Sequence, residues 1–312
     1  MDSRDPEALQ RLLIAQDGVV TRRQLREVGV GKPELDRMLR RREMARLFPG
    51  VFVNHTGPPT WRQRAWAAVL YAAPAALCLD SAEEPPADSP IHVAIDATRR
   101  VGDLDDVRVH RLHGLDPMVR WHLGPPRLRV EDNTLELARR AGDELGEIRA
   151  LTSAVGSRRT TAAHLREALD RRPRILHRAF LARVIDDLET GVCSVLEHGY
   201  LTRVERPHGL PAGDRQRRRQ GAHGAEYRDV EYDALGMVVE LDGFVGHAAW
   251  VAQGRDADRD LDDHAEGRES VRLRYPQVFG TPCRTADRLG RIMVRRGWDG
   301  KPRPCGPGCE AG

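Results

Sequence analysis

The chain has 312 residues, of which 40% are hydrophobic, and its 50 basic and 47 acidic residues give a formal net charge of +3. This length allows two or three compact domains with apolar cores, and no run of about 18 apolar residues is present to span a membrane. The first twenty residues are acidic and lack the basic start and apolar segment of a secretory signal. We therefore expect a globular, cytoplasmic protein.

Lysine and cysteine usage add two expectations. Only Lys32 and Lys301 are lysines, so nearly all basic residues are arginine. The five cysteines are odd in number and scattered, which is typical of reduced thiols (Cys78, Cys193, Cys283, Cys305, Cys309). The last two, in "CGPGC", could bind a metal, but neither a second pair nor a histidine lies beside them in the sequence. We expect residues 301–312 to form a flexible tail.

The first 57 residues predict three helices and a β-hairpin. An apolar-periodic segment over 6–16 is followed by Thr21 and Gln24, which have capping-box spacing at the start of a second helix. The third predicted helix, 32–42, has Pro33 in its first turn, and "EMARLFPGVFVN" (43–54) has two strand-like pieces around a Pro-Gly turn. This order predicts a winged helix-turn-helix domain.

In a winged helix the third helix would enter the major groove of DNA. Here it offers Glu34, Arg37, Arg40 and Arg41, while Arg46 on the hairpin would lie along the phosphate backbone. Two alternatives remain at this point, because winged helices are also used for protein contacts and a small bundle can simply carry a basic surface.

The stretches "GVVTRRQL" and "RLFPGVFV" make residues of about 8–55 similar to the N-terminal domain of the AbiEi antitoxins. These are the antitoxin half of type IV toxin-antitoxin systems. The resemblance implies binding to promoter DNA and a nucleotidyltransferase-like toxin as a partner.

The region 58–145 predicts a small α/β part. It begins with an amphipathic helix over 60–73, whose Trp61 and Trp66 are expected in the core, and continues with strands over 91–96 and 107–113. From 132 to 190 the apolar spacing is helical, and we interpret 146–185 as a helical connector.

Carboxylates alternate with apolar residues along a predicted hairpin, "YRDVEYDALGMVVELDG" (227–243). If Tyr232 faces Met237, Asp229 lies opposite Glu240, and Glu231 and Asp242 share their face. Facing carboxylates destabilise a strand pair unless a cation compensates them. Either arginines or Mg²⁺, which accepts oxygen ligands, would serve.

The order of motifs around this hairpin resembles the very-short-patch-repair endonuclease-like domain of the PD-(D/E)XK nuclease superfamily. A helix with Glu197 precedes the strand with Asp229, then come Glu240-x-Asp-Gly and His247, an Arg-Asp-rich helix, a strand with Arg274 and a closing helix ending in Gly-Trp. The resemblance covers residues of about 186–300 and implies a mixed sheet flanked by helices.

The resemblance also implies roles for single residues. Asp229 and Glu240 would bind Mg²⁺, and Glu197 would support the metal and its water. Asp242 stands where the superfamily has a lysine, and His247 would replace that lysine as the general base. Arg255 and Arg259 would either clamp phosphate or pair with nearby aspartates.

We therefore expect an α/β (α+β) multidomain protein that binds DNA and carries a magnesium-dependent endonuclease-like domain. The alternative is an AbiEi-type antitoxin or transcriptional regulator whose nuclease-like domain is inactive. A third interpretation is an α/β protein whose acidic strands are neutralised by arginine, without catalysis.

Overall fold

The structure, a computed structural model, describes residues 5–83, 88–102, 104–190, 194–221, 224–242, 265 and 267–311, and of residues 216–221 and 224–228 it describes the backbone alone. The chain is of mixed α/β class and divides into two compact units, Met1–Glu136 and Leu137–Gly312. Among the helices of the described ranges, none is both long and apolar enough to cross a bilayer.

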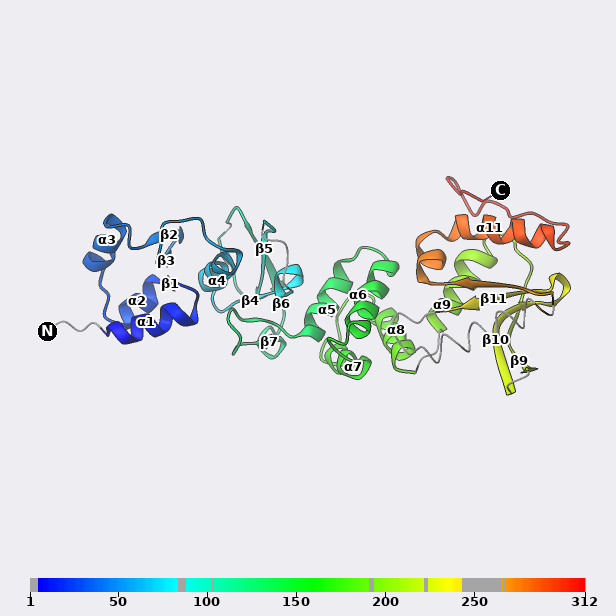
Figure 1. The fold of residues 1–312 in the computed structure, drawn as a ribbon, viewed down its shortest axis with the longest axis horizontal. Coiled ribbons are helices and arrows are strands. Elements are labelled where there is room, and N and C mark those ends of the chain that lie inside the picture. The colour runs from blue at the N-terminus through cyan, green and yellow to red at the C-terminus, as the bar shows by residue number, and fades with distance from the viewer. Residues whose placement is uncertain are drawn as a thin grey trace. The chain divides into compact units, whose positions relative to one another are not determined.

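The first unit begins with three helices and a three-stranded antiparallel sheet of order β1-β3-β2 (Figure 1). The elements are α1 (Pro6–Ala15), β1 (Val19–Thr21), α2 (Arg22–Glu27), α3 (Lys32–Arg40), β2 (Ala45–Phe48) and β3 (Val51–Val53). The predicted capping box is confirmed, since the Gln24 amide donates to Thr21 Oγ1 at 3.1 Å and the Thr21 amide donates to Gln24 Oε1 at 2.9 Å. The hairpin turn at Pro49 and Gly50 is also confirmed, with Gly50 at a φ of +77° that favours glycine.

Helix α4 (Trp61–Ala72) packs between this sheet and a second, five-stranded sheet of the same unit. One side of α4 places Trp66 and Ala67 against Val19, Val51 and Val53. Its other side joins the core of the five-stranded sheet through Ala65, Ala68, Val69 and Ala72. The small alanine side chains let both sheets lie close to the helix.

The five-stranded sheet has the order β6-β5-β4-β8-β7 and mixes parallel and antiparallel pairs. Its strands are β4 (Ala76–Leu77), β5 (Ile91–Asp96), β6 (Val107–Leu112), β7 (Val119–Arg120) and β8 (Arg127–Leu128). The predicted strands over 91–96 and 107–113 are thus confirmed, to within one residue.

Four helices form the predicted helical region: α5 (Val130–Arg140), α6 (Glu144–Gly156), α7 (Ala162–Asp170) and α8 (Arg178–Thr190). The division between the two units falls within α5. Helices α6 and α7 both pack on α8, and Leu151, Leu165 and Ile185 are fully buried.

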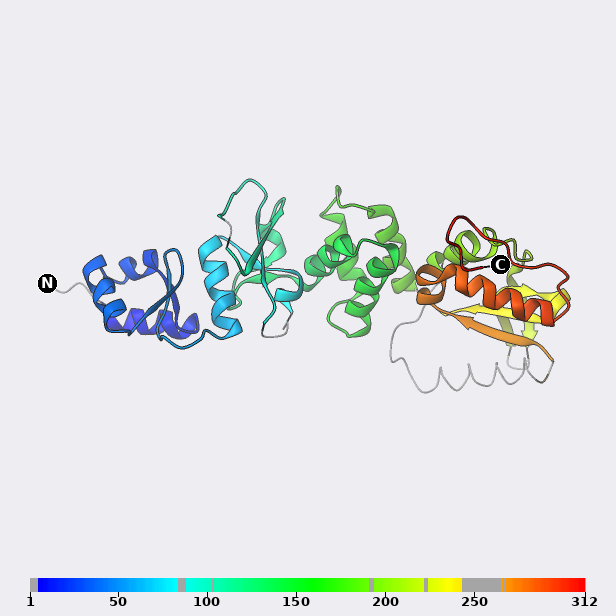
Figure 2. The same cartoon turned by 90° about the horizontal axis from the view of Figure 1, so that it is seen from above.

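The C-terminal sheet has four strands in the order β12-β11-β10-β9, with β11 and β12 parallel and the other pairs antiparallel. The strands are β9 (Asp214–Gly221), β10 (Gly224–Tyr232), β11 (Met237–Leu241) and β12 (Glu269–Leu273). Helix α9 (Ser194–Gly199) continues into a π-helical segment, Tyr200–Glu205, which packs on α11 (Pro282–Arg295). Figures 1 and 2 show α11 lying along one face of this sheet.

The hairpin register is the predicted one. Tyr232 pairs with Met237 and Val230 with Val239, and Gly236 closes the turn in the left-handed conformation, at a φ of +55°. Period-two alternation therefore sends Tyr232 and Val230 to the helix-covered face and Glu231 to the opposite face.

Candidate functional site

The face of the hairpin opposite the helices carries carboxylates, and arginines from the β12 region meet them. Glu240 pairs directly across the parallel strands with Arg272, whose guanidinium donates to Glu240 Oε2 at 3.1 Å. Asp242, the residue directly after β11, accepts a hydrogen bond of 2.9 Å at Oδ2 from Arg274, the residue directly after β12. The compensating charge required by these carboxylates is thus supplied by arginine.

A third pair extends this arrangement toward the start of β12. Arg268 Nη1 lies 3.3 Å from Glu231 Oε1, and the Glu231 side chain is only 1% exposed. The exposed fraction of the carboxylate side chain rises to 14% at Glu240 and 25% at Asp242. We call these three ion pairs the arginine ladder; it runs from a buried end to an exposed one.

Asp229 is held by the backbone of the neighbouring strand. Its Oδ2 accepts a hydrogen bond of 2.7 Å from the amide of Leu241, the last residue of β11. Leu241 stands between Glu240 and Asp242 in the sequence, so the Asp229 carboxylate lies at the end of the strand that carries them. The predicted pairing of Asp229 with Glu240 is not among the register pairs of β10 and β11, which end at Val230 and Val239; this bond joins Asp229 to Leu241 instead.

Glu197 lies on α9, as expected, and is half-buried. The start of this helix is fixed by Asp187, which accepts hydrogen bonds from Ser194 Oγ at 2.5 Å and from the Val195 amide at 2.8 Å. The predicted base His247 lies outside the described residues, together with Arg255 and Arg259.

A magnesium ion fits this arrangement poorly. Carboxylates on adjacent strands are the right donors for Mg²⁺. However, Glu240 and Asp242 already have arginine partners. A dication would have to share these carboxylates with Arg272 and Arg274, so the described side chains form an acidic face neutralised by arginine.

The helix-covered face of the sheet holds a buried polar network. The hydroxyls of Tyr200 and Tyr232 lie 2.7 Å apart, Tyr232 donates to Glu205 Oε2 at 2.9 Å, and Arg215 donates to Glu205 Oε1 at 2.8 Å. Burial raises the pKa of both tyrosines well above the usual range. The network joins the π-helical segment to β9 and β10, and its protonated phenols fit a structural role.

In the first unit, α3 presents basic side chains on the side away from its core. Leu35 packs inward, whereas Lys32, Arg40 and Arg41 are exposed. Arg37 is engaged differently, because its guanidinium forms a two-bond fork with Glu34 at 2.6 and 2.8 Å. The Glu34 carboxylate raises the pKa of Arg37 further above its usual range, so this side chain is a fixed cation.

The hairpin adds a second basic position. Arg46 on β2 is exposed at its end and lies over the Phe52 ring, with Cζ 5.9 Å from the ring centroid. The guanidinium itself therefore lies over the ring, in the geometry of a cation-π contact, while the residue as a whole is exposed. We call the four exposed basic residues of α3, its C-cap and β2 (Lys32, Arg40, Arg41 and Arg46) the basic helix-hairpin surface.

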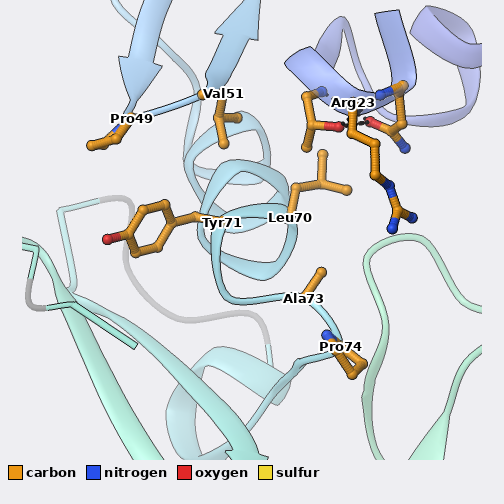
Figure 3. A pocket seen from close by; sticks show the side chains of 10 residues that line it. Arg23, Pro49, Val51, Leu70, Tyr71, Ala73 and Pro74 are labelled. Atoms are coloured by element: carbon orange, nitrogen blue, oxygen red, sulfur yellow. Dashed lines mark hydrogen bonds between the residues drawn. The ribbon is translucent and has the colours of Figure 1, made fainter. Parts of the chain in front are cut away.

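A hollow of about 480 Å³ lies beside the hairpin turn, between α2 and the end of α4 (Figure 3). Figure 3 shows Pro49, Tyr71 and Leu70 around it, with Arg23 on the α2 side. Arg23 forms an ion pair with Glu27 at 3.3 Å. The lining residues bring no group of titratable side chains together, so we assign no chemistry to this hollow.

No family model matches the chain, and no curated protein matches its sequence. The similarity to AbiEi antitoxins and to very-short-patch-repair endonucleases therefore stays a prediction.

One basic surface was missed in the sequence analysis. Helix α11 exposes a row of arginines at alternating four- and three-residue spacing (Arg284, Arg288, Arg291, Arg295). This spacing puts them on one helix face. It could have been found in the sequence, where the opposite residues Ala286, Leu289 and Met293 show the apolar repeat of a packed helix.

Proposed function

We propose that this protein is a DNA-binding regulator whose first unit contains a winged helix and whose C-terminal unit has a nuclease-like fold without its metal chemistry. The observation that carries the proposal is the exposure of four basic residues, with Lys32, Arg40 and Arg41 on or directly after α3 and Arg46 on the hairpin. In a winged helix these positions face the major groove and the phosphate backbone.

The arginine ladder supports the regulatory part of the proposal. Carboxylates that are neutralised by Arg272 and Arg274 do not require a metal, and the lysine of the nuclease motif is replaced by Asp242. The resemblance of residues 8–55 to AbiEi antitoxins adds a role as the antitoxin of a type IV system. A nucleotidyltransferase-like toxin encoded beside this gene would support that role.

DNA binding is tested by fluorescence anisotropy of the full chain with duplex DNA from upstream of its own gene, over a range of salt concentrations. The variant Arg40→Ala with Arg41→Ala should weaken binding at least tenfold and lower the salt slope by about 1 for each removed arginine that neutralises a phosphate. Arg108→Ala is a matched control, because Arg108 is an exposed arginine of β6 in the same unit. Equal affinities of the two variants would refute the proposal.

A magnesium-dependent endonuclease is the second candidate function. The observation that favours it is the bond between Asp229 and the Leu241 amide, which holds one carboxylate at the acidic end of the neighbouring strand. Plasmid nicking with Mg²⁺ tests it. Cleavage that is abolished in Asp229→Asn and kept in Asp105→Asn, a change to an exposed carboxylate of the first unit, would establish the enzyme and overturn the inactive interpretation.

A further inference from the structure

One histidine and three cysteines from separate segments converge in the C-terminal unit. They are His208 in the turn after Tyr200–Glu205, Cys283 in the first turn of α11, and Cys305 and Cys309 near the end of the chain. One ligand atom from each lies within 4.8 Å of all the others. These residues belong neither to the basic helix-hairpin surface nor to the arginine ladder.

The distances fit four ligands around one ion. Cys283 Sγ and Cys305 Sγ lie 3.6 Å apart, which is far beyond the disulfide bond length of about 2.0 Å. A tetrahedral zinc ion with Zn–S bonds of about 2.3 Å places its sulfur ligands about 3.8 Å apart. The two sulfurs are therefore already near the edge length of such a tetrahedron.

The state of His208 points to a ligand more directly. Its side chain is fully buried, and Nδ1 lies 2.8 Å from the Val204 carbonyl oxygen, so Nδ1 carries the proton and donates it. Nε2 then carries the lone pair, and it is buried without a hydrogen-bond partner among the described atoms. A bound cation would remove this penalty, and an Nδ1–H bond to a carbonyl is the usual support of a metal-bound histidine.

The segment before Cys305 is held against α11 and against the turn that carries His208. Pro302 is buried and lies so close to α11 that a Cβ at Gly290 would come within 2.0 Å of its ring. The Arg303 amide donates to the His208 carbonyl at 2.9 Å, which ties the segment to the turn that carries the histidine. The segment is thus anchored at Pro302 and Arg303, while residues 303–308 are exposed.

The "CGPGC" turn itself is shaped for two ligands. Gly308 has a φ of +78°, and the Cys309 amide donates to the Gly306 carbonyl at 3.2 Å, so the chain bends back between Cys305 and Cys309. The Ala311 amide donates to Cys309 Sγ at 3.4 Å. Amide hydrogen bonds to sulfur are common around thiolates that bind metal ions.

The donor set selects the ion. Thiolate and imidazole ligands suit zinc, whereas Mg²⁺ and Ca²⁺ require oxygen. Four protein ligands leave no position open for water or substrate, which is the pattern of structural zinc sites.

We propose that His208, Cys283, Cys305 and Cys309 bind one structural Zn²⁺, which fastens the C-terminal segment to α11 and to the turn after Tyr200–Glu205. The site is independent of the proposed DNA binding.

Metal content of the full chain, purified without chelators and measured by plasma mass spectrometry, tests the site. The wild-type protein should hold close to one equivalent of zinc, and Cys305→Ser with Cys309→Ser should lower this content at least fivefold. Cys78→Ser is the matched control, because Cys78 is a buried thiol of the other unit, and it should keep the full content.

A variant that replaces one proposed ligand by another distinguishes the loss of metal binding from misfolding. Cys309→His should still bind one ion, and after replacement by Co²⁺ its sulfur-to-metal charge-transfer absorption should fall by about a third, because two thiolates of three remain. The proposal is overturned if zinc-supplemented wild-type protein holds less than about a tenth of an equivalent, or if the double serine variant keeps its zinc.

Discussion

The three ion pairs of the arginine ladder should differ in their contribution to stability in the order of their burial. The exposed fractions of arginine and carboxylate are 17% and 1% for Arg268 with Glu231, and 60% and 25% for Arg274 with Asp242. Removing one partner of a buried pair leaves an uncompensated charge, so Arg268→Met should lower the free energy of unfolding by about 3 kcal/mol. At the exposed end, Arg274→Met should cost less than about 1 kcal/mol.

Arg272 lies between these limits, with its side chain 30% exposed and that of Glu240 14% exposed, and Arg272→Met should cost about 1–2 kcal/mol. Urea unfolding of the full chain gives the free energies, and hydrogen exchange of the β10 and β11 amides assigns the destabilisation to the C-terminal sheet. The double variant Arg268→Met with Glu231→Met is the control, because it removes both charges and should recover most of the stability.

Equal effects of all three arginine variants would refute the assignment of their stability contributions to burial. Magnesium provides a second check on the same face. If arginine is the native partner of Glu240, millimolar Mg²⁺ should leave wild-type stability unchanged. A rise of more than about 1 kcal/mol, in the wild type and in Arg272→Met, would instead indicate a metal site at these carboxylates.

Three further predictions concern the remaining parts of the fold. Burial raises the pKa of Tyr200 and Tyr232, so the unfolded chain loses these protons first and stability falls as the pH rises above about 10. The variant Tyr200→Phe with Tyr232→Phe should reduce the dependence of the unfolding free energy on pH by up to about 2.7 kcal/mol per pH unit. Urea unfolding at about pH 9 and 11 measures this dependence, and a variant with the wild-type dependence would contradict the prediction. Trp66→Ala should destabilise the first unit by about 3–5 kcal/mol, seen as a lower thermal midpoint, and a change below about 1 kcal/mol would exclude its role in the core. Thr21→Ala, which removes a capping box, should cost about 1 kcal/mol in the same assay, whereas Thr56→Ala, an exposed site of the same unit outside a helix cap, serves as its comparison.

Local signals were enough to predict much of the secondary structure. Thr21 and Gln24 are three residues apart, and a Pro-Gly pair closes the first hairpin, so each motif carries its own geometry. The register of β10 and β11 followed from alternation, because a slip by one residue would have moved Tyr232 to the carboxylate face.

Partners from distant segments could not be predicted in this way. Arg272 reaches Glu240 from 32 residues away through a parallel strand pair, and the alternation along β11 contains no information about which strand follows beside it. For the same reason the C-x3-C spacing of Cys305 and Cys309 was visible, but His208 and Cys283 join it only through the packing of α11 and the last segment.

The double packing of α4 determines how the first unit can be divided. A fragment that ended at residue 57 would keep all the strands of the three-stranded sheet but would lack Trp66 and Ala67 on its apolar face. Val19, Val51 and Val53 would then be open to water, and such a fragment should self-associate. A fragment extended through α4 would cover these valines, but it would expose Ala68 and Val69, which pack against the five-stranded sheet in the whole unit. The smallest piece that can be expressed with these apolar surfaces covered should therefore include the five-stranded sheet and run through α5 to about residue 140, because the boundary of the compact unit falls within that helix.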